Sequence, residues 1–447
     1  MTKNLSYVNE AKYFESLYPP QSLQDEISKT IGYIRKGASA QVLGLPGVGK
    51  SRLLRLLAYN KKVREFNLGQ EQEKYHFVYM DFSEIRNRPL ADVTKFMLVS
   101  LSYSLSERRM DKESEKINTF LKEALEYNDE LILFQSLKKS IDFLALEKEI
   151  SLVFLIDRFE QYAQDASEQF FVNLKILRNR AKYKFSCIFA LSRPIDMLID
   201  VSTLTEFYEF LIGNSVFMKI SHPTEPDFRL SYIEEIVQKK DEKVKEEIFL
   251  LTGGHGKLSK IAYEAILSED QIPEHLSEYL LKNRQIRGAL YEIWQYLLPH
   301  EKEHLKMKAD IDDSCEELKF LTHVGLLKDN TITIPLFAEY ISSLKEETEK
   351  FIYDEQRNEI FKGSTNISDT LTPSEFRLFR YLLQNKGITC DKESLITAIW
   401  KDSQTQEGVT DQALDQIVYR LRKKIESDPN KPQHIITIKG KGIKFVG

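Results

Sequence analysis

The run from Gly44 to Ser51, GLPGVGKS, constrains the fold of this 447-residue chain more than any other stretch. It matches the pattern G-x-x-x-x-G-K-[ST] at every fixed position. Glycines at the first and sixth positions allow a tight turn that points successive backbone N–H groups inward, toward an anion. The apolar run ASAQVL precedes the pattern at 38–43, and a helical sequence follows it from Arg52. We therefore predict a phosphate-binding loop between a buried strand and a helix.

The residues of this loop have separate roles in binding a nucleotide. Lys50 reaches the β- and γ-phosphates, and the hydroxyl of Ser51 ligates Mg²⁺. The N-terminal end of the following helix adds partial positive charge. The alternative is a glycine turn that binds nothing, and the flanking strand and helix argue against it. The predicted cofactors are ATP and Mg²⁺, and the predicted contacts are Gly44, Leu45, Pro46, Gly47, Val48, Gly49, Lys50, Ser51 and Arg52.

A second candidate metal ligand, Asp157, ends the apolar run SLVFLID at 151–157. Such a run is typical of a strand that is buried on both faces of a parallel sheet. At the carboxyl end of that strand, Asp157 would lie beside the phosphate loop and hold the Mg²⁺ shell with Ser51. The alternative is an aspartate that only caps the next helix. Two further β-rich runs, 76–82 and 185–191, predict more strands of an α/β sheet with helices on both faces.

Two later motifs carry a resemblance to a known group of ATPases. Ser192 and Arg193 follow the strand FSCIFAL, and LTGGHG stands at 251–256. Over about residues 20–350 the chain resembles the STAND and Orc-like branch of AAA-type P-loop ATPases. In that branch a serine or threonine and an arginine close the sensor strand, and LTGGHP marks the lid. The resemblance implies that Arg193 senses the γ-phosphate. Gly256 stands where the family has proline.

One departure from that family concerns hydrolysis. Many members have an acidic residue directly after the aspartate that holds Mg²⁺, where it orients the attacking water. This chain has Arg158 at that position, and the nearest carboxylate is Glu160. Glu160 either takes over the role or is an ordinary polar residue of the next helix. We therefore predict nucleotide binding with slow or absent turnover, and Glu160 and Arg193 as the candidate catalytic residues.

Composition and charge separate the two ends of the chain. No apolar run approaches the roughly 18 residues of a membrane span, and no secretory signal is evident. Cys187, Cys315 and Cys390 lack metal-ligand spacing, which predicts reduced thiols in a cytoplasmic protein. Residues 1–350 contain 48 Lys and Arg against 55 Asp and Glu, whereas residues 416–447 contain eight against two. The basic end predicts a polyanionic partner, although such ends are often only solvated.

The basic end contains an amphipathic helix and a β-hairpin. At about 100° per residue, one stripe of the predicted helix 411–425 is apolar and faces a core: Leu414, Val418, Leu421 and Ile425. Arg420, Arg422 and Lys424 flank the opposite face. Glutamine and lysine can contact base edges, and flanking cations suit phosphates. The run IITIKGKGIKF at 435–445 predicts two strands around a glycine turn. The candidate nucleic-acid contacts are Gln412, Gln416, Tyr419, Arg420, Lys423, Lys439 and Lys441.

Three motifs in this region resemble the OmpR/PhoB-type winged-helix DNA-binding domain. They are LTPSEFRLFRYLL for the first helix, LDQIVYRLRKKIESDP for the recognition helix, and IITIKGKGIKF for the wing. In the first motif Thr372 and Glu375 predict a capping box. The family has a tyrosine where this chain has Ile443. The resemblance implies binding of duplex DNA, generally as dimers on repeated half-sites. No receiver-like region precedes the domain in this sequence, so we expect a different input signal.

Five parts are thus expected: an NTPase domain (1–220), a helical lid (221–275), an internal winged helix (276–346), a linker (347–350) and an OmpR/PhoB-type domain (351–447). The main hypothesis is a nucleotide-switched, homo-oligomeric transcriptional regulator that binds duplex DNA. One alternative is a DNA-acting ATPase, such as a replication-initiator or transposition-type loader. Another is a STAND defence or signalling ATPase whose basic end contacts an unknown signalling partner instead of DNA. Salt-dependent binding of duplex DNA separates the first two hypotheses from the third.

Overall fold

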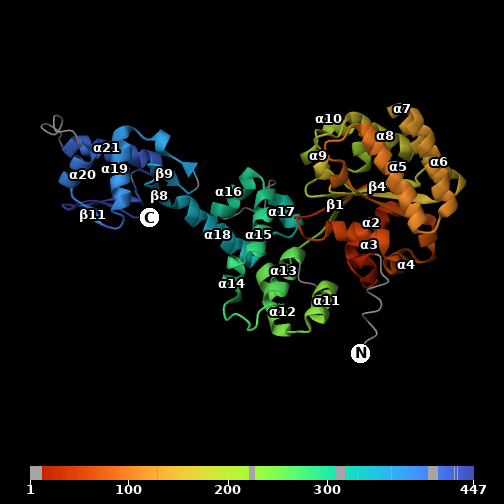
Figure 1. Cartoon of the computed structure of the whole chain (residues 1–447), viewed down its shortest axis with the longest axis horizontal. Helices are drawn as coiled ribbons and strands as arrows, with labels where there is room; N and C mark the ends of the chain where they lie inside the picture. Colours follow the sequence, from red (N-terminus) through yellow and green to blue (C-terminus); the bar gives the residue numbers. More distant parts are fainter. Residues whose placement is uncertain are drawn as a thin grey trace. The chain divides into compact units, whose positions relative to one another are not determined.

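The computed structural model describes residues 13–127, 129–220, 227–307, 318–329, 331–363, 365–400, 411–426, 428–429 and 431–446. The chain divides into two compact units, Met1–Ala338 and Glu339–Gly447. Figure 1 shows the helices and strands of each unit. Within the described residues, no helix combines the length and the apolar character that crossing a membrane requires.

A five-stranded sheet forms the centre of the first unit, with strand order β2-β3-β4-β1-β5. Every neighbouring pair of strands is parallel. Its strands are β1 Ala40–Leu43, β2 Tyr75–Asp81, β3 Ser151–Asp157, β4 Phe185–Leu191 and β5 Ser215–Phe217. All seven residues of β4 and six of the seven in β3 are buried, because helices cover both faces of the sheet (Figure 1). The predicted α/β fold is confirmed.

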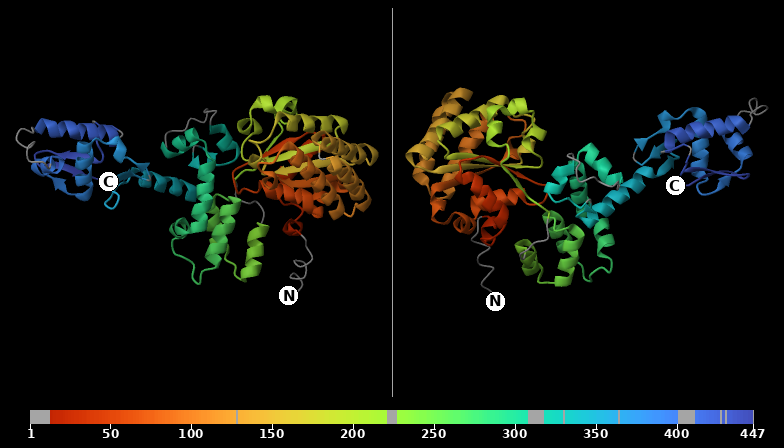
Figure 2. Two further views of the ribbon diagram at one scale, coloured as in Figure 1. Left: turned by 45° about the horizontal axis from the view of Figure 1, so that its top comes forward. Right: turned by 180° about the vertical axis from the view of Figure 1, so that it is seen from behind.

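The longer helices of this domain alternate with the strands, as parallel pairing requires. They are α2 Gln24–Arg35, α3 Lys50–Tyr59, α4 Lys61–Leu68, α5 Leu90–Glu107, α6 Asp111–Tyr127, α7 Glu130–Asp142 and α8 Glu168–Arg180. The shorter ones are α9 Ile195–Leu198, α10 Val201–Leu204, the π-helical turn η4 Phe143–Glu147, and the 3₁₀ turns η1 Phe14–Leu17, η2 Gly69–Lys74, η3 Phe82–Ile85, η5 Phe159–Gln161 and η6 Thr205–Phe210. Figure 2 shows the sheet between its helices from two further directions.

Three lid helices and a small winged-helix domain complete the first unit. The lid contains α11 Phe228–Val237, α12 Glu242–Thr252 and α13 Gly256–Leu267. The winged-helix domain contains α14 Leu276–Lys282, α15 Arg284–Tyr296, α16 Pro299–Met307, α17 Lys319–His323, and the antiparallel hairpin of β6 Leu327–Lys328 and β7 Thr331–Ile332. Asn330, in the turn of this hairpin, lies outside the described residues.

The segment predicted as a linker, 347–350, continues a helix. Helix α18 runs from Pro335 to Glu349 without a break, and β8 begins two residues later at Phe351. The sequence SSLKEETEK contains neither glycine nor proline, and lysine and glutamate are good helix formers, so nothing local ends the helix. A polar composition therefore does not indicate a loop here.

The second unit is a small α/β domain with its own core. Its elements are β8 Phe351–Asp354, β9 Glu359–Lys362, β10 Thr365–Asn366, η8 Ser368–Thr370, α19 Pro373–Gln384, β11 Thr389–Cys390, α20 Lys392–Ile399, α21 Asp411–Ile425, β12 Ile435–Ile438 and β13 Gly442–Phe445. The capping box of Thr372 and Glu375 is formed as predicted. Strands β12 and β13 pair as the expected wing, with β11 on the other side of β13. The unit is a winged helix.

Candidate functional site

The loop between β1 and α3 has the backbone that a phosphate nest requires. Gly47 and Gly49 have positive φ angles of 81° and 116°, which glycine adopts without strain. A Cβ at Gly44 would lie 2.9 Å from the Cβ of Met218, so the first glycine is required by close packing. Helix α3 then begins at Lys50, and no side chain among the described residues caps its N-terminal end. The open N–H groups of this end fit a phosphate.

Lys50 is held by the loop itself. Its Nζ donates to the carbonyl oxygens of Gly44 and Leu45, at 2.7 and 2.9 Å. Burial lowers the pKa of Lys50, and the carboxylates of Glu160 and Asp157 oppose that shift. A phosphate in the nest would offer this ammonium a charged acceptor in place of two neutral carbonyls, which is a stronger interaction.

Ser51 and Asp157 meet as the sequence predicted. The Ser51 hydroxyl donates to Oδ1 of Asp157 at 3.0 Å, and the side chain of Asp157 is buried. Tyr79, at the end of β2, donates its hydroxyl to Oδ2 of the same carboxylate at 2.7 Å. A hydroxyl and a carboxylate oxygen at this spacing suit Mg²⁺, which prefers hard oxygen ligands. The residues present therefore fit a magnesium–nucleotide complex. No sequence motif marks Tyr79 as a partner of Asp157.

Two charged residues that follow β3, Arg158 and Glu160, bond to different neighbouring strand ends. Arg158 has a left-handed backbone (φ 53°), and its guanidinium pairs with Asp81 at 3.5 Å with more than half of its side chain exposed. Glu160 turns instead toward the end of β4, where its Oε1 accepts a hydrogen bond from the backbone N–H of Ser192. The structure thus gives Glu160 a bond to the sensor strand. Its role in orienting water stays a prediction.

Arg193 lies at the predicted end of β4, but its guanidinium binds another protein group. Nη1 and Nη2 contact the two carboxylate oxygens of Glu301 on α16, at 2.7 and 2.5 Å. The rings of Tyr296 and Phe320 lie 4.5 and 4.6 Å from the guanidinium carbon. Arg193 therefore connects the sheet to the internal winged helix in this structure. Its sensing of a γ-phosphate stays a prediction, and it requires release from Glu301.

The lid motif LTGGHG touches the phosphate loop directly. His255 shares a hydrogen bond of 2.8 Å through Nε2 with the carbonyl of Pro46, and the N–H of Lys257 donates to the carbonyl of Gly47 at 3.0 Å. Because a carbonyl only accepts, Nε2 carries the proton, and Nδ1 accepts from the N–H of Leu258. Sequence reasoning identified this motif as a lid mark, but it did not identify His255 and Lys257 as contacts of the loop.

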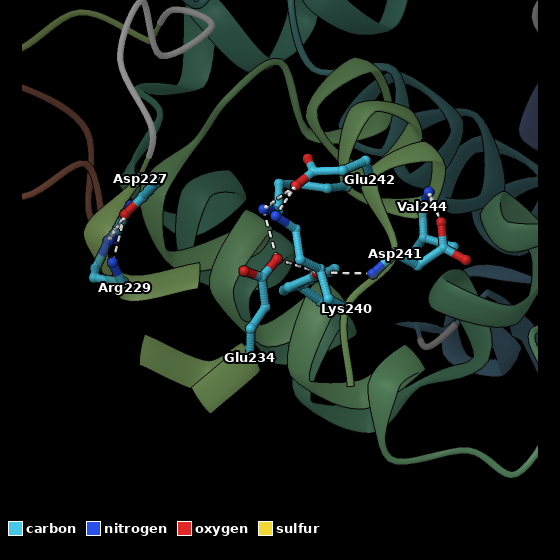
Figure 3. Close-up of polar contacts among 9 residues, drawn as sticks. Asp227, Arg229, Glu234, Lys240, Asp241, Glu242 and Val244 are labelled. Atoms are coloured by element: carbon cyan, nitrogen blue, oxygen red, sulfur yellow. Dashed lines mark hydrogen bonds and ion pairs between the residues drawn. The ribbon is translucent and has the colours of Figure 1, made fainter. Parts of the chain in front are cut away.

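A second set of lid contacts surrounds Arg52. Arg229, on α11, pairs with Asp227 (Figure 3). It also donates to the carbonyl of Gly256 at 3.0 Å. Burial and the nearby charge of Arg229 lower the pKa of Arg52, whose guanidinium lies 5.9 Å from the ring centre of Tyr18. The same close-up shows the ion pair of Lys240 with Glu242. The Asp227–Arg229 pair of the lid thus lies close enough to Arg52 of α3 to act on its charge.

An aromatic cluster joins the N-terminal segment to the lid. Tyr18 packs against Phe228 with ring centres 4.6 Å apart, and Phe14 packs against Tyr232 at 4.9 Å. The ring of Tyr18 also lies beside the guanidinium of Arg52. The sequence does not single out these four aromatic residues, because aromatic residues in short amphipathic segments are usually ordinary core residues.

Helix α21 presents the predicted nucleic-acid face of the second unit. Its apolar stripe of Leu414, Val418, Leu421 and Ile425 is buried. The opposite face is exposed: Gln412, Gln416, Tyr419, Arg420 and Lys423. The ammonium of Lys423 lies 5.0 Å from the ring centre of Tyr419, a spacing for cation–π attraction. The candidate contacts therefore share one solvent-facing surface.

Two flanking cations of α21 have hydrogen-bond partners inside the domain, and their binding of phosphates stays a prediction. Arg422 donates through Nε and Nη2 to the carbonyl of Ile435, at 3.0 and 2.7 Å, and so fixes the helix to β12. Lys424 donates to the buried carboxylate of Glu375 at 2.5 Å. Their long side chains reach acceptors inside the domain that a helical projection does not show.

The wing carries exposed cations at its tip. Lys439 and Lys441 lie in the turn between β12 and β13, where the N–H of Lys441 donates to the carbonyl of Ile438 at 2.9 Å. Gly442 has φ 129°, and a Cβ there would lie 1.9 Å from the carbonyl oxygen of Cys390. Glycine is therefore required next to the tip, and the turn holds both lysines away from the domain.

Comparison with known proteins identifies this second unit. Residues 368–445 match the family model described as "Transcriptional regulatory protein, C terminal", which confirms the OmpR/PhoB-type resemblance for that segment. The segment is similar to the Sensory transduction protein RegX3 of Mycobacterium tuberculosis, with 40% identity over 78 residues. These residues are 17% of this chain and 33% of that protein. The chain thus spans about a third of the length of the curated relatives it matches.

Similar solved structures exist for the first unit. A Walker-type ATPase of Pyrococcus abyssi has 16% identity and a TM-score of 0.42, over 71% of this chain and 95% of that one. The ORC2 protein of Aeropyrum pernix has 12% identity and a TM-score of 0.40, over 76% of this chain and 98% of that one. The strand order and the backbone of the phosphate loop define the fold of the first unit, independently of these similarities.

Proposed function

We propose that this protein is a DNA-binding transcriptional regulator whose assembly on DNA depends on a nucleotide bound at Gly44–Ser51. The observation that carries the proposal is the exposed face of α21, with glutamines, an arginine, a lysine and a tyrosine above a buried apolar stripe. The match of residues 368–445 to a transcriptional regulatory domain supports it. Duplex DNA is the partner that this chemistry fits.

The residues of the second unit divide into two kinds of DNA contact. Gln412 and Gln416 carry amide groups that can bond base edges in the major groove, with adenine as the preferred partner of a glutamine. Arg420 and Lys423, with the wing lysines, provide charge for phosphates, which sets affinity and salt dependence rather than sequence preference. Arg422 and Lys424 hold helix α21 in place for both kinds of DNA contact.

The first unit supplies the input. When bound, ATP with Mg²⁺ would supply a triphosphate and a divalent cation. Ser51 and Asp157 would hold the metal, and Lys50 would exchange the carbonyls of Gly44 and Leu45 for a phosphate oxygen. The carbonyls of Pro46 and Gly47, in the same loop, hold the lid through His255 and Lys257. A change in the loop therefore alters the contacts that dock the lid.

Formation of a homo-oligomer connects nucleotide binding to DNA binding in this proposal. A single winged helix of this size makes few contacts, and linking several copies on one DNA site raises the effective affinity without any new contact. We infer that the nucleotide state of the first unit controls homo-oligomer formation, and that oligomers place several copies of the second unit on repeated half-sites.

The test is selection of bound duplexes from a random pool, with and without ATP, followed by titration of the selected duplex. We expect Lys50→Ala in the full chain to abolish ATP binding and to weaken DNA binding through lost assembly. Lys29→Ala, which removes an exposed lysine of α2, is the matched control and should bind as the parent does. If Lys50→Ala assembles and binds DNA like the parent, the nucleotide switch is wrong. DNA-stimulated ATP turnover that Glu160→Gln removes would indicate a DNA-acting ATPase instead.

A further inference from the structure

Two arginines of the first unit, the buried Arg64 and the partly buried Arg108, share one acceptor. Arg64, on α4, donates to the carbonyl oxygens of Ala58 and Leu57 at 2.8 and 3.0 Å. Arg108, directly after α5, donates to the same Ala58 oxygen at 3.4 Å and to the carbonyl of Tyr75 at 3.1 Å. The two guanidiniums therefore converge on the C-terminal end of α3. Each has further N–H donors beyond these bonds.

The two guanidiniums form a positive spot inside the first unit. Among the residues that the structure describes, neither Arg64 nor Arg108 forms an ion pair with an aspartate or a glutamate. Burial lowers the pKa of Arg64 to about 10 and that of Arg108 to about 9, so both stay charged at neutral pH. The charges of Glu65, Glu73 and Glu107 oppose these shifts from a distance, without forming an ion pair with either arginine in the described part of the chain. Burial and these two charges hold the pKa of His76 well below its usual range. Buried charges in proteins are normally paired, so this positive spot calls for an anion.

The two arginines line a cavity of about 690 Å³ beside β2 and α5. Six of the other fourteen lining side chains are aromatic: Tyr13, Tyr59, Phe77, Tyr79, Phe96 and Tyr103. The guanidinium of Arg108 lies 5.8 Å from the ring centre of Phe77, which places it at the wall of the cavity. A volume of this order is typical of sites for small organic molecules.

Three carboxylates also line the cavity, and two of them are already bonded within it. Asp81 accepts from the N–H and the hydroxyl of Ser83. Glu107 accepts from the hydroxyl of Tyr13. The third, Glu84, is exposed to solvent, where water screens its charge. The cavity therefore offers buried donors at its arginine end and occupied or solvated acceptors elsewhere, which favours an anionic ligand over a cationic one.

We propose that this cavity is a binding site for a small organic anion, with a carboxylate or phosphate at Arg64 and Arg108 and an aromatic ring among the tyrosines. Paired guanidiniums bind such oxyanions through parallel N–H bonds, and aromatic walls bind a flat ring by edge and face contacts. The site lies apart from the phosphate loop, so it can take its ligand whether or not the loop holds nucleotide.

Tyr79 gives this site a route to the metal ligand. Its ring lines the cavity, and its hydroxyl donates to Oδ2 of Asp157 at 2.7 Å. A ligand that moves Tyr79 changes the hydrogen bonding of Asp157, and linkage then requires nucleotide to change the affinity for the ligand by the same factor. This coupling rests on the proposed nucleotide site, whereas the binding of the anion does not.

The binding test uses the full chain and two probes, phenyl phosphate and benzoate, in titration calorimetry. We expect saturable binding of at least one probe, and which probe binds identifies the anionic group. Arg64→Gln and Arg108→Gln should weaken it by roughly tenfold or more. Arg86→Gln, an exposed arginine outside the cavity, is the control and should bind normally. Absence of saturable binding by both probes, or equal binding in the arginine variants, would overturn the site.

Two further variants establish where on the chain the probe binds. Val99 lines the cavity from α5 and is half exposed, so Val99→Trp should block binding without touching the arginines or the fold. Lys50→Ala should leave probe binding unchanged; loss of binding there would place the probe at the phosphate loop and contradict the proposal. For the coupling, the bound probe should alter ADP affinity in the parent but not in Tyr79→Phe. Equal effects in both proteins would show that Tyr79 is not the route.

Discussion

Arg193 and Glu301 form a bidentate ion pair that is buried on both sides. The side chains are 6% and 0% exposed, and Nη1 and Nη2 lie 2.7 and 2.5 Å from Oε1 and Oε2. Glu301 also accepts from the N–H of Leu298 at 2.8 Å, which positions it at the start of α16. The pair thus fixes the internal winged helix to the end of β4. Strand β4 is the neighbour of β3, which carries the candidate metal ligand Asp157.

The first prediction concerns this pair. Glu301→Ala leaves a buried guanidinium without a counter-charge, which typically costs about 3–5 kcal/mol. We expect a fall of that order in the unfolding free energy of the first unit, measured in urea by tryptophan fluorescence. The chain has two tryptophans, so a Trp400→Phe background leaves Trp294 as the reporter, on α15 beside the pair. The double variant Arg193→Met, Glu301→Leu should regain most of the loss; equal losses in both variants would contradict this account.

The second prediction concerns the pH dependence of lid docking. Burial lowers the pKa of His255 from about 6.5 to about 4, and the charge of Arg229 adds to that shift while Glu292 opposes it. Between these two values the unfolded state binds the proton and the folded state does not. The unfolding free energy should therefore fall as the pH decreases from about 6.5 to about 4.

His255→Gln is the matched variant for this pH effect. A glutamine amide can donate to the carbonyl of Pro46 as Nε2 does, but it does not titrate. Other groups, including the buried His76, contribute to the pH profile of both proteins. The difference between parent and variant should therefore have a slope only in the window from about pH 4 to 6.5. Parallel profiles for the two proteins would show that His255 is not the source.

The sheet could be predicted because its strands are long and apolar. The prediction for β3 and β4 has the ends that the structure shows, since six and seven consecutive buried residues, respectively, leave little choice of register. β5 is only three residues long, and no periodicity can be measured over so short a run. The same limit applies to the end of α18, where a polar helix and a polar loop have the same composition.

The site was predictable only within its local motifs. The loop pattern identified Lys50 and Ser51, and a strand end identified Asp157. The partners that define their geometry come from distant segments: Tyr79, His255, Lys257 and Glu301. A side chain such as Lys424 lies on the expected side of its helix, yet it turns toward Glu375, which belongs to the capping box of α19. Such pairings depend on tertiary packing that a single helix pattern does not contain.

The third prediction separates base contacts from phosphate contacts. Lys441→Gln removes a charge at the wing tip, so the slope of the logarithm of DNA affinity against that of salt concentration should decrease by about 1. Gln416→Ala should leave that slope unchanged and relax preference at one base pair by about 1–3 kcal/mol. Both are measured by fluorescence anisotropy with the selected duplex and single-base variants of it. A changed slope in Gln416→Ala would place that residue at a phosphate or reveal a wider change in docking.

The fourth prediction compares two cations of α21 that a helical projection treats alike. Arg420 is exposed, whereas Lys424 bonds the buried Glu375 and the carbonyl of Thr370, at 2.5 and 2.7 Å. Arg420→Gln should reduce the salt slope of DNA binding by about 1 and leave stability unchanged. Lys424→Gln should leave the slope unchanged and lower the unfolding free energy of the second unit by about 1 kcal/mol, because a buried carboxylate loses its cation. Unfolding in urea, followed by Trp400 in a Trp294→Phe background, measures the second effect. If Lys424→Gln reduces the salt slope as much as Arg420→Gln does, Lys424 leaves Glu375 for a phosphate on DNA, and its assignment to the scaffold is wrong.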